Sequence, residues 1–199
     1  MTPRPVRSLT PGEVLALLDA AGNTREGVRD RAIVALLVDV GPTRGEVGRL
    51  VRGDYDPDRG VISIGSGEDV RRMPLGRAST AALGAVTNVG GHPLSPLLRS
   101  RSGEPVTDRA VHELLSRLSA AGDLGFIATC RHTRRTWLHW VLESLPGPVV
   151  ARLANHHPAR MRRATPEQAL AASLDVGRIS PLDRLLADPT LREMSRHAA

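Results

Sequence analysis

The segment TCRHTRRTWLHW, residues 129–140, gathers the side chains of this protein that are best suited to chemistry. It holds one cysteine, two histidines and three arginines. On a helix, His132 and Arg135 are three residues apart and share a face. A guanidinium forms charge-assisted, bidentate hydrogen bonds to phosphate, and a histidine titrates near neutral pH. The segment therefore predicts a site for an oxyanion, with phosphate as its natural ligand.

Two other chemistries are open to the same segment. Cys130 lies among cations that would lower its pKa, as a nucleophile requires, but no acyl-transfer arrangement accompanies it. His132, His139 and His156 suggest zinc, but no cysteine or glutamate framework supports such a site. We therefore expect neither a metal nor a cofactor.

The charge of the chain is compatible with a polyanionic partner. The formal net charge is +6, and all 27 basic residues are arginine because the chain has no lysine. An arginine-rich surface suits nucleic acid, since the planar guanidinium matches the phosphate group. A coding bias that replaces lysine with arginine would give the same composition, so charge alone does not establish DNA binding.

The sequence also indicates where the protein resides. Cys130 is the only cysteine, so no intramolecular disulfide is possible and a reducing compartment is expected. No run approaches the ~18 apolar residues of a membrane helix, and the opening MTPRPVRSLTP lacks the apolar centre of a signal peptide. We expect a cytoplasmic protein without a membrane partner.

Helical periodicity dominates the elements that must position these side chains. Helices are expected over Thr10–Gly22, over 28–41, from Pro42 onward, within STAALGAV, over Thr107–Gly122, at about 130–144 and 147–155, and in PEQALAASL and SPLDRLLADPTLREM of the tail. VISI and VRRMPL flank a turn rich in Gly and Asp, which predicts a β-hairpin after the third helix. The expected fold class is mainly α with a small inserted β-hairpin or sheet (α+β).

Several stretches, in order, resemble the catalytic domain of the tyrosine recombinases, the phage integrase family. GPTRGEVGRLV is similar to the family's Gly-Leu-Arg-x-x-Glu-Leu, and GSGEDVRRMPL is similar to its hairpin, usually written Gly-Lys-Gly and later Val-Pro-Leu. HTRRTW resembles His-x-x-Arg-[His/Arg]-Thr, and VVARLANHHP resembles the segment that ends in Leu-Gly-His. The resemblance covers residues 8–165, taken as one domain. Residues 166–199 are interpreted as a helical tail that packs on the domain or on a partner subunit.

The resemblance implies a phosphate site built from both arginine motifs. It places Arg44 on the family's first catalytic arginine and Glu46 on the accompanying acid. It places His132 and Arg135 on the second motif, and His156 on the later histidine. Two arginines from different helices would then bind the nonbridging oxygens of one phosphate.

Two groups with which family members cut DNA are missing from their expected positions. The nucleophilic tyrosine position falls on Thr165, and the only tyrosine in the chain is Tyr55, in the turn before the hairpin. The hairpin lysine, which in the family protonates the leaving oxygen, falls on Ser66. Arg71 or Arg72 would restore positive charge, but a guanidinium stays protonated and cannot act as general acid. Strand cleavage by the family mechanism is therefore not expected.

The leading hypothesis is a non-cleaving DNA-binding protein with a tyrosine recombinase fold, not an enzyme, in which Arg44, His132, Arg135 and His156 clamp a backbone phosphate. The wider DNA-binding surface is expected to add Arg71, Arg72, Arg131 and Arg134. Further partners would be a second copy of the chain or a full-length recombinase. Two alternatives stay open. One is a fold recruited to bind or transform an anionic small molecule, and the other is an active strand transferase with an atypical nucleophile, such as Thr165 or Tyr55.

Overall fold

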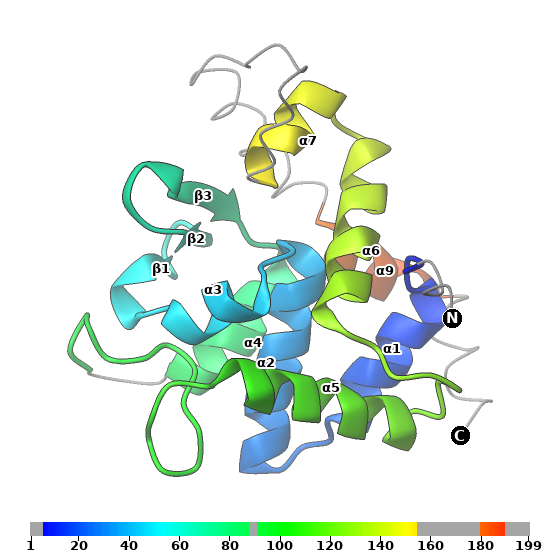
Figure 1. The fold of residues 1–199 in the computed structure, drawn as a ribbon, viewed down its shortest axis with the longest axis horizontal. Helices are drawn as coiled ribbons and strands as arrows, with labels where there is room; N and C mark the ends of the chain where they lie inside the picture. The colour runs from blue at the N-terminus through cyan, green and yellow to red at the C-terminus, as the bar shows by residue number, and fades with distance from the viewer. Residues whose placement is uncertain (1–5, 88–90, 155–179, 190–199) are drawn as a thin grey trace, which may run out of the picture.

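The computed structural model of the protein describes residues 6–87, 91–154 and 180–189 (Figure 1). Its helices are α1 (Pro11–Ala20), α2 (Arg25–Asp39), α3 (Arg44–Arg49), α4 (Arg77–Thr87), α5 (Asp108–Ala121), α6 (Cys130–Leu142), α7 (Gly147–Leu153) and α9 (Pro181–Ala187). Its strands are β1 (Tyr55–Asp56), β2 (Val61–Ile64) and β3 (Arg71–Pro74). The expected fold class, mainly α with a small inserted sheet, is confirmed.

Helix α2 forms the centre of the described structure. It contacts α1, α4, α6 and α9, and the residues from Ala32 to Val38 are at most 2% exposed. A helix that is apolar on most sides must be enclosed by other elements, as the sequence predicted for this segment. The helix begins at Arg25, earlier than the expected residue 28, because the Thr24 hydroxyl accepts a hydrogen bond from the Gly27 amide at 3.0 Å.

Threonine caps set the starts of α1 and α3. Thr10 and Glu13 form the predicted capping box, with the Thr10 amide donating to the Glu13 carboxylate at 2.8 Å. Helix α3 begins at Arg44 and not at Pro42, because Thr43 is its N-cap and Glu46 closes a second capping box. Arg44 is therefore the first residue of its helix.

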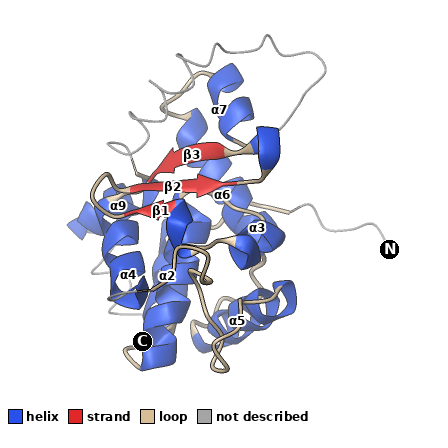
Figure 2. Ribbon diagram, turned by 90° about the vertical axis from the view of Figure 1, so that its left-hand side faces the viewer, coloured by secondary structure: helices blue, strands red, loops and turns tan. Residues whose placement is uncertain are grey.

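The sheet is small and antiparallel, with strand order β1-β2-β3 (Figure 2). The hairpin of β2 and β3 pairs Ile62 with Met73, as the sequence predicted in outline, and β1 adds a third strand. Ile62, Ile64 and Met73 are at most 1% exposed and face the core. Because side chains alternate along a strand, the residues between them face away from the core.

The segment 180–187 packs on the helices of the same chain. Asp183 of α9 accepts hydrogen bonds from the Arg77 and Ala78 amides at 2.6 and 2.8 Å, where α4 begins. The Ser180 hydroxyl donates to the fully buried Asp39, whose pKa is raised by burial. The α9 helix ends at Ala187, before the Asp-Pro step, and the helix expected in PEQALAASL lies outside the described residues. Within the described ranges, no helix has both the length and the hydropathy needed to cross a membrane.

Candidate functional site

The loop between α2 and α3 lies directly against α6. Gly41 has a φ of +59°, and a Cβ built on it would lie 2.6 Å from the ring of the fully buried Trp137. Glycine alone permits both this conformation and this close approach. Since Arg44 follows three residues later, the contact positions the start of α3 beside α6.

Arg134 of α6 secures the same loop. Its guanidinium donates to the Gly41 carbonyl at 2.5 Å and to the Ala154 carbonyl just after α7. Burial lowers the pKa of Arg134, the positive charge of Arg71 lowers it further, and Glu46 opposes both effects. One guanidinium therefore joins the α2–α3 loop, α6 and the end of α7.

Glu46 and Arg71 form a nearly buried ion pair. The two guanidinium–carboxylate contacts are 2.6 and 3.1 Å long, and the side chains are 10% and 7% exposed. Burial by itself would raise the pKa of Glu46, but hydrogen bonds from Arg71 and from the Thr43 amide outweigh it and lower the pKa to about 2. Glu46 is therefore ionised at neutral pH and ties α3 to the sheet.

Arg44 completes the group from the start of α3, where its side chain is exposed. Its charge acts on Cys130, which lies one helical turn before Arg134 on α6. Burial raises the pKa of the Cys130 thiol to about 12 despite Arg44, so this thiol is not an activated nucleophile.

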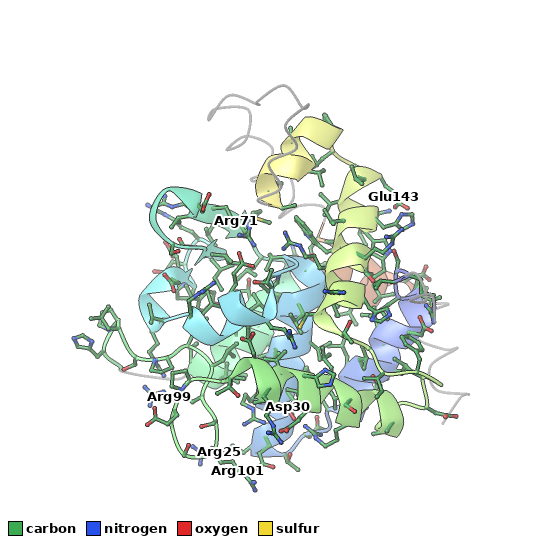
Figure 3. All side chains as sticks on the ribbon, viewed as in Figure 1. Arg25, Asp30, Arg71, Arg99, Arg101 and Glu143 are labelled. Atoms are coloured by element: carbon green, nitrogen blue, oxygen red, sulfur yellow. The ribbon has the colours of Figure 1, made fainter. Side chains whose placement is uncertain are left out.

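The Arg71 guanidinium contacts the Glu46 carboxylate, the charge of Glu46 also acts on Arg134, and Arg44 lies two residues before Glu46 at the start of α3. Arg44, Arg71 and Arg134 carry three positive charges, and Glu46 is the acid in direct contact with Arg71. Figure 3 shows Arg71 between the sheet and α6. We call these four residues the arginine cluster. An excess of positive charge beside exposed Arg44 favours an anion, and phosphate matches arginine geometry best.

The structure does not bring His132 and Arg135 to the arginine cluster. Successive helical residues are rotated by about 100°, so His132 lies on the opposite side of α6 from Arg134. Arg135 is exposed, and its backbone carbonyl accepts from the Ser8 hydroxyl at 3.5 Å. Arg134, and not the predicted Arg135, lies near Arg71 and Glu46, because the buried Thr136 and Trp137 fix the rotation of α6.

His132 belongs to a different group of side chains near the amino terminus. Its Nδ1 lies 2.8 Å from the Thr129 hydroxyl, and its ring centroid is 5.3 Å from that of Phe126. The Arg7 guanidinium lies over the Phe126 ring, 4.5 Å from the ring centroid. Burial and the charge of Arg7 lower the pKa of His132, so the neutral imidazole is favoured here.

A different alignment of the second motif fits the structure. The sequence Arg134-Arg135-Thr136 matches Arg-[His/Arg]-Thr without a gap, whereas counting from His132 leaves no residue between arginine and threonine. Arg131, which is exposed, then occupies the histidine position. The sequence-based prediction placed Arg131 and Arg134 only on the wider DNA-binding surface. The Arg135-Thr136 pair that follows Arg134 is the feature that could have identified Arg134 as the motif arginine.

The remaining predicted positions lie apart from the arginine cluster or outside the described residues. Arg72 is exposed while its neighbour Arg71 is buried, because the two alternate along β3. Ser66 is exposed in the hairpin turn. His156 and Thr165 lie outside the described residues. The described part of the chain contains no group of three His, Cys, Asp or Glu residues placed to hold a metal ion.

Tyr55 is placed as a structural residue. It is 8% exposed, and its hydroxyl donates to the Thr80 carbonyl of α4 at 3.2 Å. Burial, helped by Asp56, raises its pKa. A buried, hydrogen-bonded phenol with a raised pKa is a poor nucleophile, which weighs against its use in strand transfer.

The Glu46 ion pair predicts a specific acid sensitivity. The folded pKa of about 2 lies below the ordinary value of 4.5, so the stabilisation is complete above about pH 4.5 and is lost as the pH falls toward 2. The contribution is about 3 kcal/mol. In urea titrations, the stability difference between wild type and Glu46→Gln should shrink clearly between about pH 5 and pH 3.

Glu113→Gln is the matched control for that titration. Glu113 pairs with Arg109 on the surface of α5 and its side chain is 59% exposed, so its effect should stay within about 0.5 kcal/mol at every pH. If the difference in free energy of unfolding between wild type and Glu46→Gln stayed constant from about pH 5 to pH 3, the prediction would be contradicted.

Comparison with known proteins gives a consistent picture. Residues 7–164 match the phage integrase family. The tyrosine recombinase XerC of Xylella fastidiosa strain 9a5c is 30% identical over 115 residues, which is 57% of this chain and 39% of that protein. The chain thus spans about two fifths of the length of this relative.

Solved structures share the fold. A crystal structure of XerA recombinase has a TM-score of 0.67 and 18% identity, covering 99% of this chain and 66% of that one. The Tn1549 transposon integrase in complex with circular intermediate DNA has a TM-score of 0.66 and 17% identity, covering 85% of this chain and 67% of that one. At these identities the similarity establishes the fold of the described elements.

Proposed function

Because the chain belongs to the phage integrase family, we propose that it binds duplex DNA through one backbone phosphate at the arginine cluster and does not cut the strand. The observation that supports this proposal is the approach of Arg71 and Arg134 to Glu46, beside the exposed Arg44 at the start of the same helix α3. Arg44 is the exposed member and makes the first contact with phosphate. Arg131, exposed one turn before Arg134, adds a second cation on the same helix.

The members of the arginine cluster have different roles in this proposed binding. Arg71 is held by Glu46 and Arg134 by two carbonyls, so these two mainly add positive potential and rigidity. Arg44 forms no ion pair with any described residue, so its donors are available to a ligand. Because Arg71 and Arg134 are already held in place, the Arg44 side chain is the member of the arginine cluster that phosphate binding must still order.

The absence of cleavage is proposed from the residue inventory. Tyr55 is the only tyrosine in the sequence and is buried under α4, and no lysine is present to protonate a leaving oxygen. A guanidinium cannot replace that general acid, a function typically worth about 10²- to 10⁴-fold in rate. The DNA complex of the similarly folded Tn1549 integrase supports DNA as the ligand class.

The test is a gel shift on duplex DNA with wild type and Arg44→Ala. Removal of one charge-assisted phosphate contact should weaken binding by about 10-fold or more and reduce the salt slope by about 1. Arg77→Ala, which removes an equally exposed charge at the start of α4, should change affinity less than about 2-fold. No duplex binding by wild type at low ionic strength would refute the proposal.

A second assay addresses cleavage alone. A nicked suicide duplex traps the covalent adduct of a strand transferase, because the released end diffuses away before religation. We expect no adduct from wild type under conditions in which the gel shift is complete. An adduct that disappears in Thr165→Ala or Tyr55→Phe would establish the strand-transferase alternative.

A further inference from the structure

A second concentration of arginines lies far from the arginine cluster. It lines a pocket of about 780 Å³ between the start of α2, the end of α4 and the segment 97–101. Figure 3 shows Arg25, Arg99 and Arg101 together at the end of the molecule opposite Arg71. The length of α2, which runs between the two ends, corresponds to roughly 20 Å. The pocket is therefore separate from the phosphate site proposed above.

The pocket wall is strongly unbalanced in charge. Among the described residues that line it, five are arginine and one, Glu26, is an acid. Arg29 is paired with Asp30 at 2.6 Å, and Arg101 reaches Glu26 at 3.4 Å. The other arginines of the wall, Arg25, Arg52 and Arg99, have no carboxylate within ion-pair distance in the described part of the chain. Like charges gathered without counterions repel one another, so an anion in the pocket would stabilise the arrangement.

Arg52 shows this imbalance most clearly. Its Nη1 donates to the Thr87 carbonyl at 2.9 Å, while its Nε is buried and has no hydrogen-bond partner among the described residues. A Cβ on Gly91 would lie 2.8 Å from that Nε, so the guanidinium is enclosed on this side. A half-buried guanidinium whose Nε lacks a partner is destabilised, and the charge of a multiply charged ligand nearby would offset part of that cost.

The pocket also has an apolar surface. Val28, Val86 and the buried Leu97 contribute aliphatic side chains, and Thr24 and Ser100 add hydroxyl groups at the rim. Small-molecule sites commonly combine such a surface with a few polar groups, in volumes of about 300 to 1,000 Å³. The combination suits a ligand with a flat or apolar body and several negative charges.

We propose that this pocket binds a nucleoside polyphosphate, with the phosphates on Arg25, Arg52 and Arg99 and the base against Val28, Val86 and Leu97. A double helix presents its phosphates on a convex surface, and it would leave the aliphatic side chains in water. The pocket thus favours a small ligand over duplex DNA. This inference does not depend on the proposed function of the arginine cluster.

The proposal is tested by calorimetric titration of the full chain with ATP and, separately, with inorganic tripolyphosphate. ATP is expected to bind in the micromolar range, and tripolyphosphate should bind more weakly because it leaves the apolar surface uncovered. The double variant Arg25→Ala/Arg99→Ala should weaken ATP binding by at least 10-fold. Both side chains are exposed, so the variant should fold, which a thermal melt verifies.

The matched control is Arg59→Ala/Arg77→Ala, which removes the same charge from exposed positions outside the pocket. It should change ATP affinity less than 2-fold. An equal loss in both double variants, or no binding of ATP at millimolar concentration, would overturn the proposal.

A gel shift on the same variants separates this proposal from DNA binding. Arg25→Ala/Arg99→Ala should bind duplex like the control double variant does. If the pocket variant loses duplex affinity as strongly as ATP affinity, the pocket is part of a DNA surface and the small-ligand proposal fails.

Discussion

Replacement of Arg134 by alanine is expected to lower the free energy of unfolding by about 3 to 5 kcal/mol, since a hydrogen bond to a charged group contributes about 1.5 to 3 kcal/mol. The Arg134 guanidinium makes two such bonds, to the carbonyls of Gly41 and Ala154, and both residues are buried. Truncation leaves both carbonyls without this donor. Urea denaturation followed by tryptophan fluorescence measures the loss, because Trp137 lies against Gly41.

Arg135→Ala provides the control on the same helix. Arg135 is exposed, and its guanidinium forms no hydrogen bond or ion pair with a described residue, so the change should stay within about 0.5 kcal/mol. A loss below about 1 kcal/mol for Arg134→Ala would contradict the role assigned to its two hydrogen bonds. A larger loss for Arg135→Ala than for Arg134→Ala would contradict the assignment of Arg134 as the arginine that holds the α2–α3 loop.

The second large effect is expected for Gly41→Ala, which should lower the free energy of unfolding by about 2 to 5 kcal/mol. A left-handed conformation costs an L-residue about 1 to 2 kcal/mol, and overpacking a filled core typically adds about 1 to 3 kcal/mol. Both apply here, because φ is +59° and the new Cβ would meet the Trp137 ring at 2.6 Å. The rigid indole cannot withdraw as a flexible side chain would. The midpoint of urea denaturation, compared with wild type, measures the effect.

Gly22→Ala separates the two contributions. Gly22 has a similar φ of +69°, but a Cβ there would meet nothing within 4 Å. Its substitution should therefore cost only the backbone part, about 1 to 2 kcal/mol. Equal losses at the two glycines would show that the contact with Trp137 does not constrain the loop that carries Arg44.

Much of the local structure could be predicted from the sequence. Thr10 and Glu13 predict the start of α1, and the pattern of VISI and VRRMPL predicts the hairpin. Arg44 could also be placed at the start of a short helix, although Pro42 suggested a slightly earlier beginning. These features depend on neighbouring residues along the chain, so a linear pattern contains their physical cause.

The rotation of α6 was decided by tertiary packing. The Thr136 hydroxyl accepts a hydrogen bond from the Leu9 amide at 2.7 Å, and Trp137 is fully buried against the α2–α3 loop. These contacts turn Arg134 toward Arg71 and leave Arg135 exposed. Three arginines and a histidine lie within five positions of this helix, so its sequence pattern alone does not select which one faces the other elements.

The sequence by itself determined the residue inventory: arginine without lysine, a single tyrosine, and the order of helices around one hairpin. Only the tertiary structure decided which guanidiniums meet. Arg71 faces Glu46 while Arg72 faces solvent, and Arg25, Arg52 and Arg99 come together from distant parts of the chain. The physical reason is that composition and capping act locally, whereas the convergence of charges depends on which faces of the helices and strands are buried against one another.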